Sequence, residues 1–255
     1  MPVTAVSGSA SGIGAAVCTL LREAGHRIIG IDRANAEVVA DLSTRAGRQA
    51  AVAQVLEQSG GVLDGLVCCA GLGVTAASSS LVLAVNYFGV SELLDGLADA
   101  LAKGENPAAL VIGSVAATQP GADQQPMVAA LLGGDETLAL ELANALGQPH
   151  IAYASSKYAV TCDARRKSVQ WAAQGIRLNV VAPGAVETPL HQAAKDDARF
   201  GQAVREFVAP LGRAGNPAEI ARVVAFLQSQ QASFVTGSVV FVDGGMDAMV
   251  RAQRF

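Results

Sequence analysis

Apolar stretches alternate with helical patterns along most of the chain. Short apolar runs bounded by turn residues predict buried strands, and longer segments with apolar residues at helical spacing predict helices. The predicted strands are Val3–Ser7, Arg27–Asp32, Gly65–Cys69, Ala108–Ser114, Arg177–Ala182 and Ser238–Val242. The main predicted helices are Ile13–Ala24, Thr44–Gln58, Leu81–Leu101, Tyr153–Gln174 and Pro217–Gln228. This alternation predicts an α/β fold, a single-domain Rossmann-type doubly wound parallel sheet with helices on both faces.

One long segment interrupts the alternation directly before the helix predicted from Tyr153. Residues 118–150 contain two prolines near their start, the pair Gly133-Gly134 and a helical run over Glu136–Ala145. We expect this insertion to form one or two helices packed over the carboxyl edge of the sheet. A connection of this length is usually functional or mobile.

Composition narrows the classes of partner. Apolar residues make up 51% of the 255 residues and aromatic residues only 4%, so small aliphatic side chains must fill the core. The net charge is −4 and no basic block occurs, which argues against a nucleic-acid partner. No run of about 18 apolar residues is free of charge or turn signals, so we expect no membrane span.

Targeting, redox and metal signals are weak. The N-terminus lacks a charged region before its first apolar run, which predicts no signal peptide. None of the four cysteines has C-x-x-C spacing, so we expect free thiols and a cytoplasmic protein. The three histidines are far apart in sequence, with no carboxylate or cysteine grouped near them, so we expect no metal site.

A glycine-rich turn joins the first predicted strand to the first helix, reading Val6-Ser7-Gly8-Ser9-Ala10-Ser11-Gly12-Ile13-Gly14. Gly8 suits a tight turn, Gly12 lets the backbone approach a pyrophosphate, and Gly14 lets the helix pack near the strand. The helix N-terminus offers N–H groups and partial positive charge to phosphates. The spacing is G-x-x-x-G-x-G, and such a turn alone is weak evidence. The candidate cofactor-binding residues here are Gly8, Ser11, Gly12, Ile13 and Gly14.

Acidic residues follow the next apolar runs. Asp32 ends the second strand, where a carboxylate can accept hydrogen bonds from an adenosine ribose and would repel a 2′-phosphate. NAD is therefore favoured over NADP, although Arg33 offers a guanidinium to a phosphate. The alternative for Asp32 is a turn cap. Asp41 and Leu42 are expected to meet the adenine, with an N-cap of the following helix as the alternative for Asp41.

Four polar residues form a candidate proton-transfer set. Tyr153 and Lys157 lie one turn apart on one helix face, and Ser114 ends a strand on the ligand-binding side of the sheet. The phenol of a solvated tyrosine has a pKa of about 10, and a nearby ammonium is expected to lower it toward the working range. Asn86, within the long preceding helix, is expected to hold a water that links Lys157 to solvent. Tyr-x-x-x-Lys alone is usually an ordinary amphipathic pair, so the order and placement of the whole set carry the hypothesis.

At this point the sequence resembles the short-chain dehydrogenase/reductase family over nearly its whole length. The Gly8/Gly12/Gly14 turn is similar to the family's cofactor loop, and Cys69-Ala70-Gly71 is similar to its Asn-Ala-Gly motif, with Cys69 in place of asparagine. The resemblance implies that Asn86, Ser114, Tyr153 and Lys157 form the catalytic tetrad. It adds Ala70, Gly71, Tyr153 and Lys157 to the cofactor-binding residues. Pro183 to Thr188 is similar to the segment that holds a nicotinamide carboxamide, through Val186 and Thr188.

A narrower resemblance is to the bacterial 3α-hydroxysteroid dehydrogenase/carbonyl reductases. It rests on Asp41-Leu42-Ser43-Thr44, residues 66–73, Val85-Asn86-Tyr87-Phe88-Gly89, the long 118–150 segment, residues 243–248 and the final Gln253-Arg254-Phe255. Ser114 and Tyr153 lie 39 positions apart, a longer separation than most of the family has. The resemblance implies NAD-dependent oxidation of the 3α-hydroxyl of a steroid or bile acid to the ketone. It also implies reduction of other ketones and aldehydes.

The same resemblance leads to expectations about substrate binding and assembly. We expect residues 118–132 and 190–208 to build an apolar substrate wall, the latter as a possible lid. The alternatives are a short-chain enzyme for another alcohol (a sugar, acyl thioester or quinone) and a non-catalytic NAD sensor, which would have no need of Ser114, Tyr153 and Lys157 together. The 118–150 insertion would obstruct the family's usual pairing through its long helices. A homodimer through residues 217–242 is therefore expected.

Overall fold

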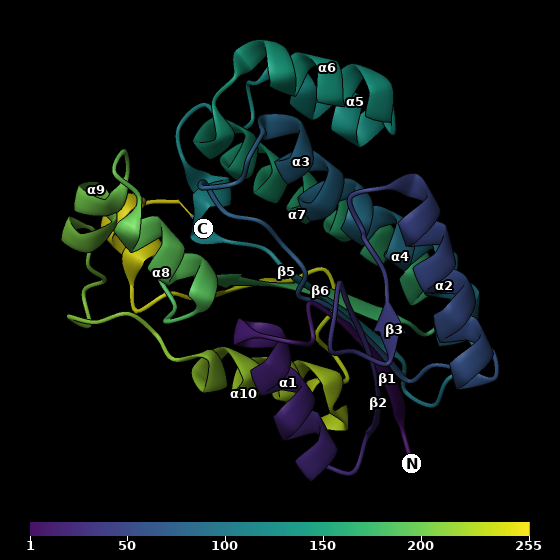
Figure 1. The fold of residues 1–255 in the computed structure, drawn as a ribbon. Coiled ribbons are helices and arrows are strands. Elements are labelled where there is room, and N and C mark those ends of the chain that lie inside the picture. The colour runs from purple at the N-terminus through teal and green to yellow at the C-terminus, as the bar shows by residue number, and fades with distance from the viewer. Residues whose placement is uncertain (255) are drawn as a thin grey trace.

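Seven parallel strands form one sheet in the order β3-β2-β1-β4-β5-β6-β7. This computed structural model describes residues 1–254; Phe255, which belongs to the C-terminal resemblance, lies outside the described residues. Helices cover both faces of the sheet (Figure 1). The strands are β1 Val3–Ser7, β2 Arg27–Asp32, β3 Val38–Val39, β4 Gly65–Cys68, β5 Ala108–Ile112, β6 Arg177–Pro183 and β7 Val239–Val242. The predicted fold class is confirmed.

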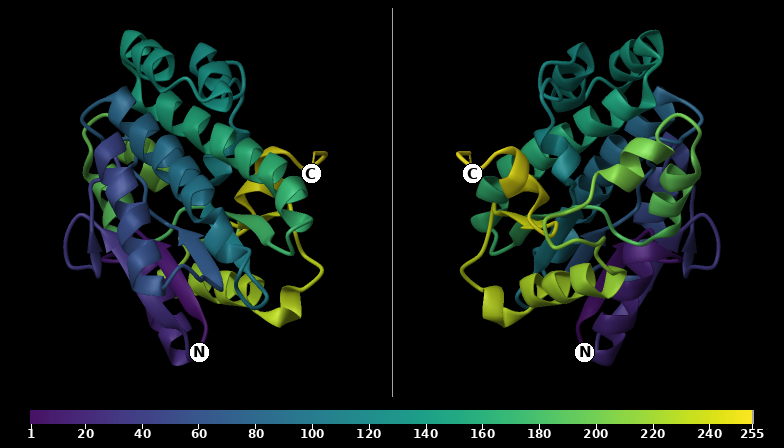
Figure 2. Two further views of the ribbon diagram at one scale, coloured as in Figure 1. Left: turned by 90° about the vertical axis from the view of Figure 1, so that its right-hand side faces the viewer. Right: turned by 90° about the vertical axis from the view of Figure 1, so that its left-hand side faces the viewer.

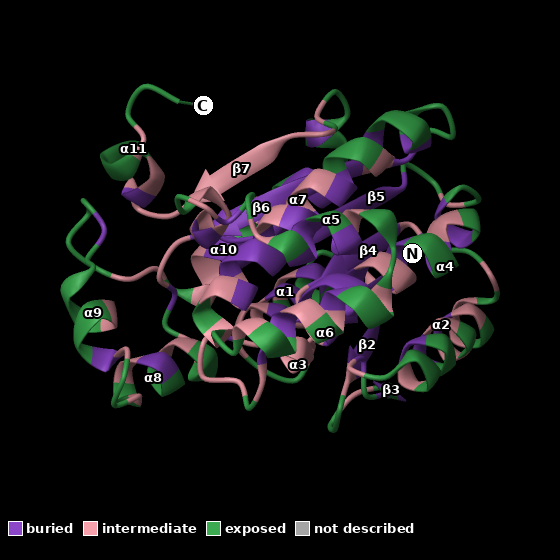
Figure 3. Ribbon diagram, turned by 90° about the horizontal axis from the view of Figure 1, so that it is seen from above, coloured by how far each residue is buried: buried purple, intermediate pink, exposed green. Residues whose placement is uncertain are grey.

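Two apolar layers enclose the sheet. One packs against α2, α4 and α7 through residues such as Leu93 and Val160, and the other packs against α1 and α10 through residues such as Val17 and Ile220. Buried residues are concentrated in the central strands and on the inner faces of these helices (Figure 3). The helices are α1 Gly12–Glu23, α2 Arg45–Ser59, α3 Ser79–Leu83, α4 Gly89–Leu101, α5 Pro126–Gly133, α6 Glu136–Leu146, α7 Pro149–Ala172, α8 Pro189–Asp196, α9 Gly201–Glu206, α10 Pro217–Gln228 and α11 Met246–Val250.

Two predicted helices differ from the observed ones in ways that affect the site. The helix α7 begins at Pro149, with Gln148 as its N-cap, so Tyr153 lies in the second turn and not at the helix start. Proline at N1 suits a helix start because its missing N–H has no intrahelical partner there. The long helix predicted over Leu81–Leu101 begins at Ser79 and contains one π-helical turn, η1, over Ala84–Phe88. Asn86 lies in the middle of that turn.

The insertion forms two helices, α5 and α6, but the expected placement is wrong. They pack against α3 and α7 and make an outer layer beyond the helices, not a cover over the carboxyl edge (Figure 2). Gly134 ends α5 in the left-handed conformation, and the Asp135 carboxylate accepts a hydrogen bond from the Leu138 N–H at the start of α6. Arg166 on α7 donates to the Leu132 carbonyl and ties this layer down.

The predicted lid segment is helical in this structure. Helices α8 and α9 span most of residues 190–208. Lys195 pairs with Glu187 at 2.7 Å, and the ring of Phe200 lies 5.5 Å from that of His150 at the start of α7. These contacts hold α8 and α9 beside the carboxyl ends of the strands, at the left of Figure 1.

One helix within residues 1–254, Ser79–Leu101, is long and apolar enough to cross a membrane by length and composition alone. Its most apolar 18-residue window is 61% buried inside the protein. It supplies core residues such as Leu93 and Leu97. We therefore interpret it as a core helix.

Candidate active site

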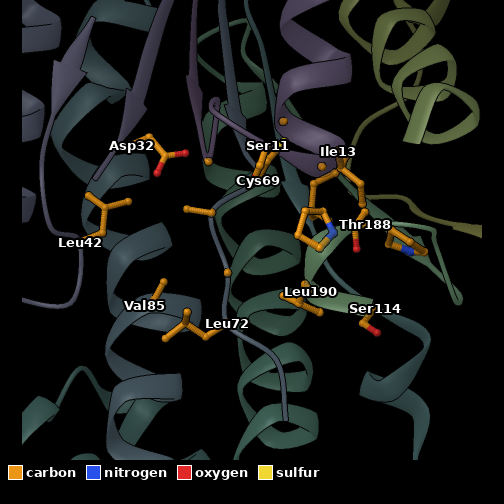
Figure 4. A pocket seen from close by; sticks show the side chains of 18 of the residues that line it. Ser11, Ile13, Asp32, Leu42, Cys69, Leu72, Val85, Ser114, Thr188 and Leu190 are labelled. Carbon is orange, nitrogen blue, oxygen red and sulfur yellow. The ribbon is translucent and has the colours of Figure 1, made fainter. Parts of the chain in front are cut away.

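A cavity of about 580 Å³ lies at the carboxyl ends of the strands. Figure 4 shows Asp32 and Leu42 at one end of it and Ser114 at the other. Every residue proposed from the sequence lines this cavity except Asn86. The lining residues from that set are Gly8, Ser11, Gly12, Ile13, Gly14, Asp32, Asp41, Leu42, Ala70, Gly71, Ser114, Tyr153, Lys157, Val186 and Thr188.

The turn after β1 fits a dinucleotide pyrophosphate. Gly8 and Gly12 have positive φ angles of 70° and 54°, and a Cβ on Gly14 would lie 2.0 Å from the Gly8 carbonyl oxygen. A Cβ on Gly8 would lie 2.7 Å from the Ala70 nitrogen. Ser11, the N-cap of α1, makes no side-chain capping bond, and the first turn holds no acidic residue. The positive end of α1 therefore faces the cavity and suits an anionic group.

Asp32 lies beside this turn. Its carboxylate accepts hydrogen bonds from the Ala10 N–H at 3.0 Å and the Arg33 N–H at 2.7 Å. Both donors are backbone N–H groups, and no cationic side chain pairs with the carboxylate among these contacts. Asp32 lines the cavity. Arg33 also lines it. The residues present fit an adenosine ribose at this end.

Asp41 and Leu42 follow β3 in a short turn. The Asp41 carboxylate accepts from the Ser43 N–H at 2.9 Å, and hydrogen bonding with Ser43 is the main reason why the pKa of Asp41 is lowered. The N-cap of α2 is Thr44, whose hydroxyl accepts from the Gly47 N–H. The alternative role for Asp41 as the helix N-cap is therefore wrong.

Asn86 is buried and holds the loop after β4. Its Oδ1 accepts from the Leu72 N–H at 2.8 Å, and its Nδ2 donates to the Leu72 carbonyl at 3.0 Å and to the Ser156 hydroxyl at 3.3 Å. A Cβ on Gly71 would lie 3.3 Å from Asn86 Oδ1 and 3.7 Å from Lys157 Nζ. Asn86 thus links the Gly71 loop to α7 beside Lys157. The π-helical turn that carries it is of a kind often found at functional sites.

Ser114, Tyr153 and Lys157 meet at the chemical end of the cavity. Ser114 follows β5 and accepts from the Ala116 N–H at 3.1 Å. Lys157 is buried and donates to the Ile112 carbonyl at 2.8 Å. Its Nζ lies 6.0 Å from the centre of the Tyr153 ring.

The pKa of Tyr153 is raised and not lowered in this structure. Burial raises the pKa of Tyr153 above its ordinary value, and the hydrogen bond with Ser114 opposes that rise. Lys157, whose ammonium donates to the Ile112 carbonyl, is not among the groups that shift the Tyr153 pKa in this structure. Burial lowers the pKa of Lys157 itself to about 8. Tyr153 is therefore a protonated phenol near neutral pH, suited to donate its proton to a carbonyl oxygen.

Cys69 occupies the position where the resembling motif has asparagine. Its N–H donates to the Ser7 carbonyl at 3.1 Å, and the Ser7 hydroxyl accepts from the Ala70 N–H at 3.2 Å. The loop is therefore held to β1 without an asparagine side chain. Burial raises the pKa of Cys69 well above its ordinary value, so the thiol stays protonated at neutral pH.

Thr188 organises the far wall of the cavity. It caps α8: its hydroxyl accepts from the His191 N–H and donates to the Val186 carbonyl, each at 3.2 Å. Val186 forms an isolated bridge with Gly215. Both residues therefore stand in a rigid corner between β6 and α8.

The apolar wall differs in part from the expectation. Residues 118–132 do not line this cavity, whereas Leu190 from the expected lid does. Residues 117–121, 123 and 124 line a second hollow together with Tyr158 and residues 249–254, because the chain after Ser114 turns along α7. Ser114 lines both hollows. The apolar wall residues that sequence reasoning missed are Leu72, Leu81 and Val85. Because Leu81 and Val85 are four residues apart, the sequence predicts that they share one face of their helix. It does not show whether that face meets the cavity.

Among residues 1–254, no group of three or more His, Cys, Asp or Glu side chains is placed to hold a metal ion. In the same range the four cysteines carry free thiols.

Two family models match the chain. One, described as short chain dehydrogenase, matches residues 2–148, and the other, described as Enoyl-(Acyl carrier protein) reductase, matches residues 137–247. A curated 3-alpha-hydroxysteroid dehydrogenase/carbonyl reductase of Comamonas testosteroni is 46% identical, with 100% of each chain covered. A galactitol 2-dehydrogenase of Cereibacter sphaeroides is 32% identical over 94% of this chain and 93% of that protein.

The fold also matches a solved relative closely. The crystal structure of the 3-alpha-hydroxysteroid dehydrogenase from Pseudomonas sp. B-0831, complexed with NADH, is 66% identical with a TM-score of 0.98. The match covers 99% of this chain and 100% of that one. The chain therefore belongs to the short-chain dehydrogenase/reductase family.

Proposed function

We propose that this protein is an NAD(H)-dependent oxidoreductase that interconverts the 3α-hydroxyl and 3-oxo groups of steroids, and that it also reduces other ketones and aldehydes. The observation that carries the proposal is one cavity with an anion-binding glycine turn and Asp32 at one end and Ser114, Tyr153 and Lys157 at the other. Two 3α-hydroxysteroid dehydrogenases, 66% and 46% identical to this chain, support the steroid, and the NADH bound to the first supports the cofactor.

The cofactor end is assigned residue by residue. Gly8, Ser11, Gly12, Ile13 and Gly14 would hold the pyrophosphate at the N-terminus of α1. Asp32 would accept hydrogen bonds from the adenosine ribose, and Asp41 and Leu42 would contact the adenine. Ala70 and Gly71 would border the sugar, while Val186 and Thr188 would hold the carboxamide. Bound NAD supplies the hydride acceptor, and NADH the donor.

At the chemical end the chain's own groups move a proton. In carbonyl reduction the Tyr153 hydroxyl donates its proton to the substrate oxygen, which the Ser114 hydroxyl orients. In alcohol oxidation Tyr153 must first release its phenolic proton to solvent, and the phenolate then takes the hydroxyl proton of the substrate. Lys157 supplies positive charge below its pKa of about 8 and would hold the nicotinamide ribose. Asn86 fixes the Leu72 loop, and by resemblance it would order a water beside Lys157.

The lining favours a steroid over a polyol. Leu72, Leu81, Val85 and Leu190 face the same cavity, and an apolar wall suits a fused hydrocarbon ring system rather than a chain of hydroxyls. The galactitol 2-dehydrogenase relative supports the second candidate, a dehydrogenase for a sugar alcohol. We further propose that residues 1–255 act as one catalytic domain in the cytoplasm, and that residues 190–208 close over bound substrate.

We also propose a homodimer through α10 and β7. The strand β7 is an edge of the sheet, and Phe226 and Phe234 nearby are exposed. An edge strand presents backbone groups ready to pair with a second copy. The α5–α6 layer covers part of the surface formed by α3 and α7, whereas β7 has no strand beyond it in the sheet.

A substrate panel tests the reaction class. Oxidation followed by NADH absorbance should give a kcat/KM for a 3α-hydroxysteroid at least about tenfold above that for galactitol, since one buried apolar group changes discrimination by roughly tenfold or more. The 3β-epimer should also be slower, because its hydroxyl points away from the position that Ser114 and Tyr153 define when the ring system is held in the same place. A preference for galactitol would reject the steroid assignment and leave the family assignment standing.

Tyr153→Phe tests the proton donor. Turnover should fall by about 10² to 10⁴-fold, the range supplied by a positioned acid or base, while NADH binding measured by fluorescence stays unchanged. Tyr158→Phe is the matched control, because Tyr158 lies on the same helix but does not line the cavity that holds Tyr153 and Lys157. Normal turnover of the Tyr153→Phe variant would show that another group transfers the proton.

Asp32→Ser tests cofactor choice. Loss of a charged hydrogen bond, worth about 1.5–3 kcal/mol, should weaken NADH binding and raise the ratio of NADPH to NADH affinity by roughly tenfold or more. Asp99→Ser, on the exposed side of α4, serves as control. Equal use of both cofactors by the unaltered enzyme would mean that Arg33 outweighs Asp32.

Phe226→Glu tests the dimer. Light scattering should give twice the 25.8 kDa chain mass for the unaltered protein and a single chain mass for the variant, because a charge would be buried at the interface. Val39→Glu, at the opposite edge of the sheet, should remain dimeric. A tetramer, or a dimer that tolerates Phe226→Glu, would contradict this interface.

A further inference from the structure

A buried arginine connects the insertion to the cofactor cavity. Arg48 on α2 is fully buried, which is rare for a charged side chain unless it is paired. It pairs with Glu92 on α4 at 3.0 Å and with Glu136, the first residue of α6, at 2.7 Å. Both contacts of Glu136 go to the same guanidinium nitrogen, at 2.7 and 2.8 Å. One side chain thus joins α2, α4 and the insertion.

The same guanidinium also reaches the turn after β3. Arg48 Nη1 donates to the Leu42 and Ser43 carbonyls, each at 3.4 Å. Gly47 packs closely against the same turn, since a Cβ on Gly47 would lie 2.0 Å from the Asp41 carbonyl oxygen. Leu42 is buried and lies at the Asp32 end of the cavity (Figure 4). Arg48 therefore fixes the backbone of a segment whose other side faces the cavity.

We propose that Arg48 is a positioning residue for adenine binding, held in place by Glu136 of the insertion, through its contacts with the carbonyls of residues 42 and 43. The proposal rests on the assignment of Asp41 and Leu42 to the adenine under the proposed function. It gives the α5–α6 insertion a role in cofactor affinity in addition to any effect on assembly.

The physics favours an arginine here. Its planar fork can serve two carboxylates and two carbonyls at once, which a lysine ammonium cannot do with the same geometry. Glu136 lies in the first turn of α6, where the helix dipole stabilises a carboxylate. Arg48 also lies 5.9 Å from the ring of Phe88, in the π-helical turn that carries Asn86. An effect transmitted by that route would change turnover, so the two routes can be told apart.

The test uses the full-length protein and a set of matched variants. Arg48→Met keeps the side-chain volume. Removing one partner of a buried ion pair destabilises most when the other charge stays buried, but Glu92 and Glu136 are partly exposed, so water can solvate their carboxylates and the variant is expected to fold. Glu136→Ala removes only the insertion's contact. Glu141→Ala is the matched control, an exposed glutamate on the same helix. The measurements are the NADH dissociation constant by fluorescence titration, inhibition by 5′-AMP, Tm, and steroid turnover at saturating NADH.

Arg48→Met should weaken NADH and 5′-AMP binding by about tenfold, since misplacing a binding group by about 1 Å can cost even more. Glu136→Ala should weaken NADH and 5′-AMP binding by a smaller factor. The affinities of Arg48→Lys for both ligands should lie between those of Arg48→Met and those of the unaltered protein. Glu141→Ala should change neither. For reduction of a 3-oxosteroid at saturating NADH, the kcat and the KM for the steroid should stay within about twofold of the values of the unaltered protein.

Three results would overturn the proposal: unchanged NADH and 5′-AMP binding in a folded Arg48→Met variant, a parallel fall in kcat at saturating NADH, or an equal effect of Glu141→Ala. Where Arg48→Met does not fold, Glu136→Ala decides, and unchanged NADH binding in it rejects the proposal. Asp41→Ala separates this inference from the adenine assignment. If that variant binds 5′-AMP normally while Arg48→Met does not, the adenine assignment of Asp41 fails and the positioning role of Arg48 stands.

Discussion

Beside β1 the sheet reverses its strand order, since β2 pairs on one side and β4 on the other. The connections after β1 and β4 therefore separate at their carboxyl ends and leave the crevice in which α/β sheets bind ligands. The helix α1 can begin directly beneath that crevice only because Gly14 has no side chain, as a Cβ there would meet the Gly8 carbonyl at 2.0 Å. Two other loops of the site meet this turn, since a Cβ on Gly8 would lie 2.7 Å from the Ala70 nitrogen and one on Gly12 would lie 3.3 Å from the Thr188 side chain.

Burial sets the charge states at the chemical end. The same loss of solvent acts in opposite directions on the two ionisable groups, raising the pKa of the Tyr153 phenol and lowering that of the Lys157 ammonium. Both changes favour the neutral forms. The Ile112 carbonyl still gives the Lys157 ammonium a partner, and Ser114 opposes the rise at Tyr153. The site thus keeps a proton on Tyr153 and a cation nearby over the neutral pH range.

The features that could be predicted from the sequence are those that depend on residues close together in the chain. The apolar runs and their turns predicted the strands of the sheet except the two-residue β3, and the spacing of Gly8, Gly12 and Gly14 predicted the turn, because backbone conformation and close approach depend on neighbouring residues. Asp32, Ser114, Tyr153 and Lys157 could be placed from their positions at strand ends and helix turns. The resemblance to the family added Val186 and Thr188.

Tertiary structure decided what depends on residues far apart in the chain. No local pattern distinguishes the π-helical turn at Asn86 from the α-helix around it, or shows that Lys157 bonds to the Ile112 carbonyl. The position of the α5–α6 layer also depends on contacts between distant segments, and Arg48 and Glu136, which pair, lie 88 residues apart. The apolar wall likewise brings together Leu72, Leu81 and Val85. Packing and burial choose among these contacts, and both are properties of the folded chain as a whole.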